Sequence, residues 1–262
     1  MLRVILSFDD GRKDNYRAAM EIMKPLDIPA TFNITTGYIL QNIADNDKPG
    51  PHAPMNLDEL NELAACELFE IAGHGYTHDN DIENLLNGVL VLRKLLPNAK
   101  INGVASPHSE FKLSDLKIAQ EKFNENGIRY LRISNDYTKM SQTKIWLRRL
   151  NRVLHLSSLY AWVNEDSIEI EAKFLLHSFP VIRDNKLREV KKLINRLREN
   201  SLDSDSVCIL MLHSILKPGE DYYKDLFSWD YDDFFNLCKY LSEQLKKGNI
   251  LMCRTNDLFK ES

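Results

Sequence analysis

Near its amino terminus the chain carries Arg3-Val4-Ile5-Leu6-Ser7-Phe8-Asp9-Asp10-Gly11, an apolar, β-branched run that ends in two carboxylates and a glycine. Such a run predicts a buried strand followed by a turn. In β/α folds the loops after the strands converge at the carboxyl ends, so polar side chains placed there are candidates for function. Taken alone, the two aspartates are equally explained by one of them capping a helix.

The same alternation of strand and helix continues along the chain. We predict strands at residues 3–8, 30–35, 69–71, 103–106, 128–133, 207–212 and 250–253, and helices at residues 14–26, 57–64, 82–96, 113–126 and 232–247. This order is typical of a parallel sheet or of a β/α barrel. No change in composition marks a linker, so we expect one domain spanning residues 1–262.

Composition narrows the class of protein. Apolar residues make up 44% of the 262 residues, enough for a core without disulfides or a structural metal. The net charge is −4 and no basic stripe is present, which argues against a nucleic-acid partner. The four cysteines are scattered without a C-x-x-C pair, the first residues are too few for a signal peptide, and no apolar run is long enough to be transmembrane. We therefore expect a soluble, cytoplasmic protein.

Two histidines follow the predicted strand at residues 69–71. The segment His74-Gly75-Tyr76-Thr77-His78 separates two imidazoles by four residues, which would place both on one side of a helical turn. This spacing suits zinc-type coordination. With Asp10 as third ligand, the site would be a two-histidine, one-carboxylate face with open positions for water and substrate. A single histidine, by contrast, is more often a satisfied core or surface residue.

A further histidine, His213, ends the apolar run Val207–Leu212. An imidazole at the end of a buried strand has few structural reasons to exist, although a core histidine bonded to backbone is one. A similar string, Leu175-Leu176-His177-Ser178, makes His177 a rival. We favour His213 because its strand is the cleaner one and a turn follows it.

Together these residues resemble the polysaccharide deacetylase family, the NodB-homology domain of carbohydrate esterase family 4. The family's motifs T-F-D-D-G, I-P-A-T-F-F, H-[ST]-x-x-H, R-x-P-[YF]-G and L-x-H correspond to residues 7–11, 28–33, 74–78, 105–109 and 211–213. The resemblance is close from residue 1 to about Ile133 and again from Val207 to the end.

The resemblance implies a distorted (β/α) barrel with about seven strands. It also implies a role for each of the site residues. It implies Asp9 as general base, His213 as general acid, and one divalent ion held by Asp10, His74 and His78. Zinc is expected, with cobalt, manganese or nickel as alternatives. The turn at Pro107 and His108 would supply an N–H to the oxyanion. The substrate would be an N-acetylated sugar, sugar-nucleotide or lipid-linked saccharide, a precursor of a surface polysaccharide such as O-antigen or capsule.

Two departures from the family pattern affect the surroundings of the site. Ala105 stands where the family has an arginine that orients the base, and the supporting Asp-Trp motif has only a weak counterpart, Asp136 with Tyr137. Arg132 and Arg183 are the candidates that could reach the Asp9 carboxylate instead, because the loops of a barrel converge on one face. The alternative is that backbone N–H groups alone hold Asp9 and the enzyme is slow or selective. Alternative functions are hydrolysis of another C–N bond, in a cyclic amide or formamide, and carbohydrate binding by a pseudo-enzyme.

Residues 145–159 mix arginines with apolar side chains at helical spacing. The ordinary interpretation is an amphipathic helix with a solvated charged face. The alternative is contact with a lipid-linked or anionic substrate.

Overall fold

The structure is a computed structural model that describes residues 1–40, 53–109, 111–134, 140–165, 173–201 and 206–259. The candidate Asp136 lies outside these ranges. No helix among the described residues is long and apolar enough to cross a membrane.

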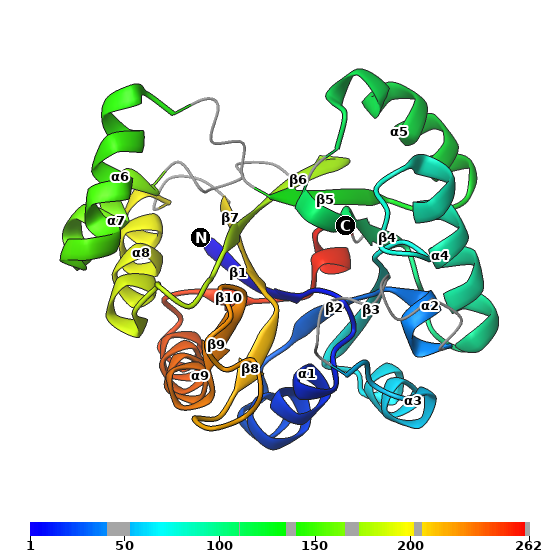
Figure 1. Cartoon of the computed structure of the whole chain (residues 1–262), viewed down its shortest axis with the longest axis horizontal. Coiled ribbons are helices and arrows are strands. Elements are labelled where there is room, and N and C mark those ends of the chain that lie inside the picture. Colours follow the sequence, from blue (N-terminus) through cyan, green and yellow to red (C-terminus); the bar gives the residue numbers. More distant parts are fainter. Residues whose placement is uncertain (41–52, 110, 135–139, 166–172, 202–205, 260–262) are drawn as a thin grey trace.

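Seven parallel strands form a closed barrel in the described part of the chain (Figure 1). In order around the ring they are β1 (Leu2–Phe8), β2 (Ala30–Ile34), β3 (Phe69–Gly73), β4 (Gly103–Ala105), β5 (Tyr130–Ser134), β6 (Leu175–Pro180) and β7 (Ser206–Leu212). The ring closes because β7 pairs with β1 along its whole length, from Leu2 opposite Ser206 to Phe8 opposite Leu212. The predicted (β/α) barrel with about seven strands is confirmed.

Helices surround the barrel (Figure 1). They are α1 (Lys13–Ala18), α2 (Thr36–Ile39), α3 (Leu57–Ala65), α4 (Ile82–Leu95), α5 (Leu116–Glu125), α6 (Gln142–Leu154), α7 (Ser157–Val163), α8 (Leu187–Asn200) and α9 (Tyr231–Lys246). The helix expected at residues 14–26 begins as α1 and continues as a π-helical and then a 3-10 turn. Asn56 caps α3, because its side chain accepts from the Glu59 N–H while Glu59 accepts from the Asn56 N–H.

Three elements differ from the sequence-based expectation. Strand β6 was not predicted, since His177 and Ser178 interrupt its apolar pattern. The last predicted strand exists as β10 (Leu251–Met252), but it pairs with β1 outside the closed ring. The long helix expected at residues 145–159 is divided into α6 and α7, because the backbone at His155 has a φ of 50°. A short pair, β8 (Ser214–Leu216) and β9 (Ser228–Asp230), follows β7.

The side chains that face the barrel interior differ between its two ends. The middle and amino end are filled by a small apolar cluster of Ile5, Ala72, Tyr130, Leu176, Val207 and Ile209. A 3-10 turn at Thr255–Phe259 closes this end, and the Phe259 ring stacks on Tyr130. Because side chains alternate along a strand, Ser7, Asn33, Arg132 and Ser178 take inward positions toward the carboxyl ends. The carboxyl end of the barrel therefore presents polar side chains above the apolar cluster.

Candidate active site

The two aspartates after β1 point to different neighbours. The Asp9 N–H still donates to the carbonyl of Leu212, as in the sheet, at 2.9 Å. Asp10 leaves the strand with a φ of 76°, and Gly11 follows with a φ of 77°. Both aspartates are buried. The turn therefore places two buried carboxylates side by side with separate sets of partners.

Asp10 meets the two predicted histidines. Its Oδ1 lies 3.4 Å from Nε2 of His74 and 3.1 Å from Nε2 of His78. A tetrahedral zinc ion with bonds of about 2.0–2.1 Å separates its ligand atoms by about 3.3 Å. The three side chains thus fit one divalent ion. Within the described ranges, no other group of three histidine, cysteine, aspartate or glutamate side chains has such an arrangement.

The backbone holds both histidines in place. His74 follows β3, and its Nδ1 lies 3.0 Å from the Ala105 carbonyl, an arrangement in which Nδ1–H donates and Nε2 is left to bind a metal. The expectation of a helical turn from His74 to His78 is wrong, because this segment is a non-helical loop. Gly75 has a φ of 77° and His78 a φ of 62°, and Oδ1 of Asn84 accepts from the Tyr76 N–H at 2.7 Å. A tethered loop, not a helix face, brings the imidazoles together.

Arg12 holds the other oxygen of Asp10. Its Nε donates to Asp10 Oδ2 at 2.7 Å, and its Nη1 donates to Ser214 Oγ at 2.9 Å. Burial raises the pKa of Asp10, but the Arg12 charge and the bonds from the two histidines outweigh burial and hold this pKa well below its usual range. Arg12 was not among the predicted site residues, although a cation directly after Asp-Asp-Gly was a visible signal.

One oxygen of Asp9 accepts hydrogen bonds from two side chains. Nδ2 of Asn33 donates to Oδ1 of Asp9 at 2.8 Å, and Arg132 donates to the same oxygen. Arg132 is only 1% exposed and also donates to Ser178 Oγ. Of the two candidate arginines, Arg132 reaches Asp9, whereas Arg183 donates to the Tyr223 carbonyl. Asn33 was missed, although a polar residue inside a buried strand was the available signal.

The position of Arg132 explains how it replaces the arginine that the family pattern has at position 105. Ala105 on β4 and Arg132 on β5 are paired in register. Paired residues of neighbouring parallel strands face the same side of the sheet, so both face the barrel interior. The guanidinium therefore enters at the same level of the barrel, one strand further around the ring.

His213 lies across from Asp9. It follows β7, its Nε2 is 4.0 Å from Asp9 Oδ2, and its ring packs on Phe227 with a centroid distance of 4.9 Å. Nδ1 of His213 is buried and has no hydrogen-bond partner among the described residues. Burial lowers the pKa of His213 to about 4, against the opposing charges of Asp10 and Asp9. The rival His177 alternates with the inward-facing Ser178 on β6 and so faces away from the ring.

The turn that was predicted to supply an N–H to the oxyanion lies beside the predicted metal ligand His78. Pro107 and His108 form a 3-10 turn after β4, and the His108 ring is 4.6 Å from the His78 ring between centroids. His108 has a φ of 55°. Positive φ at Asp10, His78 and His108 concentrates backbone strain at this end of the barrel, a pattern typical of functional sites.

The part of the chain that matches a known family is the amino-terminal half, which includes the site residues described above up to His108. Residues 2–122 match the sequence model of the family described as polysaccharide deacetylase. The predicted resemblance to the polysaccharide deacetylases is confirmed. No curated protein matches the chain in sequence.

Two of the similar solved structures have a TM-score above 0.5 and share the fold. The Bc1960 peptidoglycan N-acetylglucosamine deacetylase is 16% identical, with a TM-score of 0.52 over 99% of this chain and 89% of its own. A mutant of BA3943, a CE4 family pseudoenzyme with restored enzymatic activity, is 12% identical, with a TM-score of 0.51 over 100% of this chain and 68% of its own. IcaB from Ammonifex degensii is 19% identical over 49% of this chain, with a TM-score of 0.40, and this chain spans 58% of its length.

Proposed function

We propose that this chain is a metal-dependent hydrolase that removes the N-acetyl group from a sugar. The observation that carries the proposal is the meeting of Asp10, His74 and His78 at metal-binding distances, beside a second carboxylate, Asp9, oriented by Arg132. A structural metal site needs only ligands. An oriented carboxylate beside open coordination positions is what a hydrolytic site needs.

The three ligands favour a borderline ion. Two imidazoles and one carboxylate suit zinc, and cobalt, manganese and nickel can occupy the same face. When bound, the ion would lower the pKa of a coordinated water and polarise the acetyl carbonyl. Arg12 occupies Oδ2 of Asp10, which leaves Oδ1 as the ligand atom.

The remaining residues have separable roles in proton transfer. Asn33 and Arg132 occupy Oδ1 of Asp9, so Oδ2 is the oxygen that accepts the proton of the attacking water. His213 delivers a proton to the leaving amine. Because its pKa is lowered to about 4, His213 is neutral near neutral pH and must receive this proton inside the site, where Asp9 Oδ2 is 4.0 Å away. The backbone N–H of His108 donates to the oxyanion.

The proposed substrate is an N-acetylated saccharide carried on a nucleotide or a lipid, a precursor in the making of a surface polysaccharide. The amide chemistry follows from the family match in residues 2–122. A cytoplasmic location is supported by the cysteines, since all four of them are free thiols.

Two alternatives use the same fold. The pseudo-enzyme alternative rests on Ala105, and the guanidinium that Arg132 supplies from the neighbouring strand weakens it. Hydrolysis of a cyclic amide or formamide would use the same residues, so only the released product separates it from deacetylation.

The test is an assay of released acid with the zinc-loaded protein, using N-acetylated sugar-nucleotides and lipid-linked N-acetylated saccharides, with an N-formyl sugar and a cyclic amide as comparisons. We expect acetate from at least one N-acetylated saccharide, and none from an Asp9→Asn control. Formate as the sole product would replace deacetylation by deformylation. Saccharide binding without turnover, with zinc and with cobalt, manganese or nickel, would make the chain a pseudo-enzyme.

A further inference from the structure

Helix α6 leaves its apolar face uncovered. Trp146, Leu150, Val153 and Leu154 lie on one face of the helix, because they recur at steps of four, three and one residues. Val153 is 80% exposed, Trp146 61% and Leu154 48%. Asn151 is the one buried residue of α6. The sequence-based interpretation, a helix with only its charged face in solvent, therefore describes half of what α6 presents.

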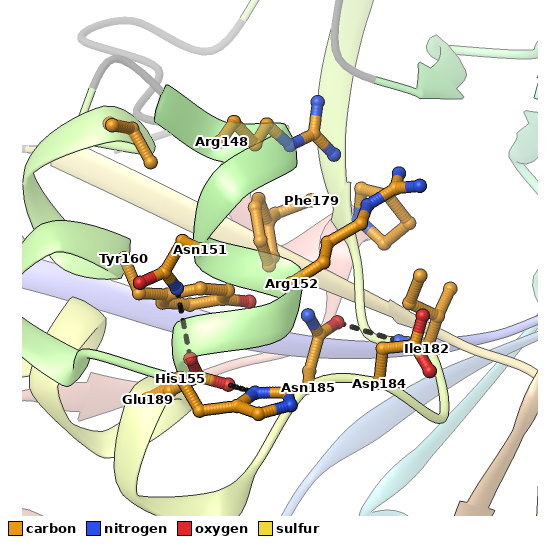
Figure 2. Close-up of a pocket in the computed structure, with 12 residues that line it drawn as sticks. Arg148, Asn151, Arg152, His155, Tyr160, Phe179, Ile182, Asp184, Asn185 and Glu189 are labelled. Carbon is orange, nitrogen blue, oxygen red and sulfur yellow. Dashed lines mark hydrogen bonds and ion pairs between the residues drawn. The ribbon is translucent and has the colours of Figure 1, made fainter. Parts of the chain in front are cut away.

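Cations border this apolar face, and α6 contains no acidic residue. Arg149 lies beside Trp146 and Val153, while Arg148 and Arg152 project together from an adjacent side (Figure 2). Among the described residues, no carboxylate forms an ion pair with Arg149 or Arg152. The chain as a whole has a net charge of −4, so this local excess of positive charge is not a property of the whole surface.

Helix α6 is also close to the end of the barrel that holds the site. Arg148 and Arg152 line a small pocket with Pro180 and Ile182, which end and follow β6 (Figure 2). Arg183 in the same segment donates its N–H to the Leu226 carbonyl, next to the Phe227 that packs on His213. Leu226 and Phe227 are themselves exposed. The segment after β6 thus connects α6 with the surroundings of the site.

We propose that the exposed face of α6 binds a membrane surface that contains anionic lipids. The side chains of Trp146, Val153 and Leu154 insert at the boundary of the hydrocarbon region. The arginines beside them form ion pairs with the headgroup phosphates. Aromatic and aliphatic side chains opposite Lys and Arg are the composition of helices that lie in the interface.

A second copy of the chain is the less suitable occupant. In a two-fold dimer the same patch meets itself, so the arginines of one α6 would face those of the other. No carboxylate on α6 is present to pair with them. An anionic lipid surface has no such repulsion.

The test is co-sedimentation of the full chain with vesicles of phosphatidylcholine alone or mixed with phosphatidylglycerol. We expect binding to the mixed vesicles that weakens as salt is added, because salt screens the arginines. Trp146→Ser with Val153→Ser should abolish binding. Arg149→Gln with Arg152→Gln should lower the partition coefficient about thirtyfold, since each basic residue near an anionic surface contributes about 1 kcal/mol, roughly fivefold.

The control variants remove two other exposed apolar side chains, from helix α5 and from the turn before it. Leu113→Ser with Ile118→Ser, 54% and 60% exposed in the native chain, should leave vesicle binding unchanged. Asp9→Asn should also bind vesicles as the native chain does, which separates this proposal from the proposed deacetylation. Absence of binding by the native chain, or equal binding by the Trp146 and Val153 variant, would overturn the proposal. A concentration-dependent dimer that this variant abolishes, without vesicle binding, would assign the face to a second copy instead.

Discussion

Arg132 on β5 donates a hydrogen bond to Asp9 after β1, although 123 residues separate them in the sequence. Both side chains are buried. Removing one partner of a buried ion pair leaves the other charge uncompensated, which costs about 3–5 kcal/mol. We therefore expect Arg132→Ala to lower the free energy of unfolding by that amount, measured by urea denaturation, and to lower kcat by about 10- to 100-fold through misplacement of Asp9.

Loss of stability alone does not establish an orienting role, so a relocated arginine is the sharper experiment. Ala105 and Arg132 are in register and face the same interior. Ala105→Arg combined with Arg132→Ala moves the guanidinium one strand back. We expect the double variant to recover part of the kcat that Arg132→Ala loses. A double variant as slow as the single one, yet equally folded, would contradict an orienting role.

Replacing Asp9 should greatly lower turnover without removing the metal, because of the two aspartates only Asp10 is proposed to bind the ion. Asp9→Asn keeps the shape of the side chain but cannot accept the proton of water, so we expect kcat to fall by about 10²- to 10⁴-fold. Metal content, measured by mass spectrometry, should stay at about one ion per chain because the proposed ligands are Asp10, His74 and His78. If Asp9→Asn lost the ion, Asp9 would have to be reassigned as a ligand.

His78 should be needed for the ion and not for folding. It lies in a loop at the carboxyl end of the barrel, outside the apolar core. We expect His78→Ala to lose most of the bound metal while its thermal unfolding without metal matches that of the native chain. His177→Ala, which changes a histidine facing away from the ring, is the matched control and should keep its metal. Equal metal content in both variants would refute the ligand assignment.

Replacing His213 and replacing the rival His177 should affect kcat differently. His213→Ala should keep metal but lower kcat, because the leaving amine then lacks a proton donor in the site. His177→Ala should leave kcat nearly unchanged. Steady-state kinetics on both variants decides between them, and a larger loss for His177→Ala would show that the wrong strand end had been chosen.

Glu70 predicts a pH dependence of stability at the opposite end of the barrel. Burial raises the pKa of Glu70 above its usual value, although the Asn256 N–H and the hydroxyls of Tyr130 and Thr31 donate to it. The folded chain then binds more protons than the unfolded chain between the two pKa values, so Glu70 lowers stability as the pH rises from about 4 toward its raised pKa. Glu70→Gln should flatten this decline in urea denaturation curves. An unchanged slope would contradict the raised pKa.

The elements that the sequence predicted are those with strong local signals. Strand β1 is an uninterrupted apolar run, α3 has a cap and a periodic apolar face, and the Asp-Asp-Gly and His-x-x-x-His segments are short and continuous. Strand β6 was missed for the converse reason, since polar residues that face the barrel interior interrupt its pattern. The helical turn expected from His74 to His78 was wrong because a spacing of four fits a loop as well as a helix.

The sequence by itself determined the alternation of strands and helices, the adjacent aspartates and the pair of histidines, because each depends on neighbours within a few residues. Only the tertiary structure decided that Arg132 replaces the arginine missing at position 105, that His213 rather than His177 faces Asp9, and that α6 leaves Trp146 and Val153 in solvent. These three depend on strand register, on which side of the barrel a residue faces and on how completely neighbouring helices cover one another. Such relationships join residues far apart in the chain, and no local spacing encodes them.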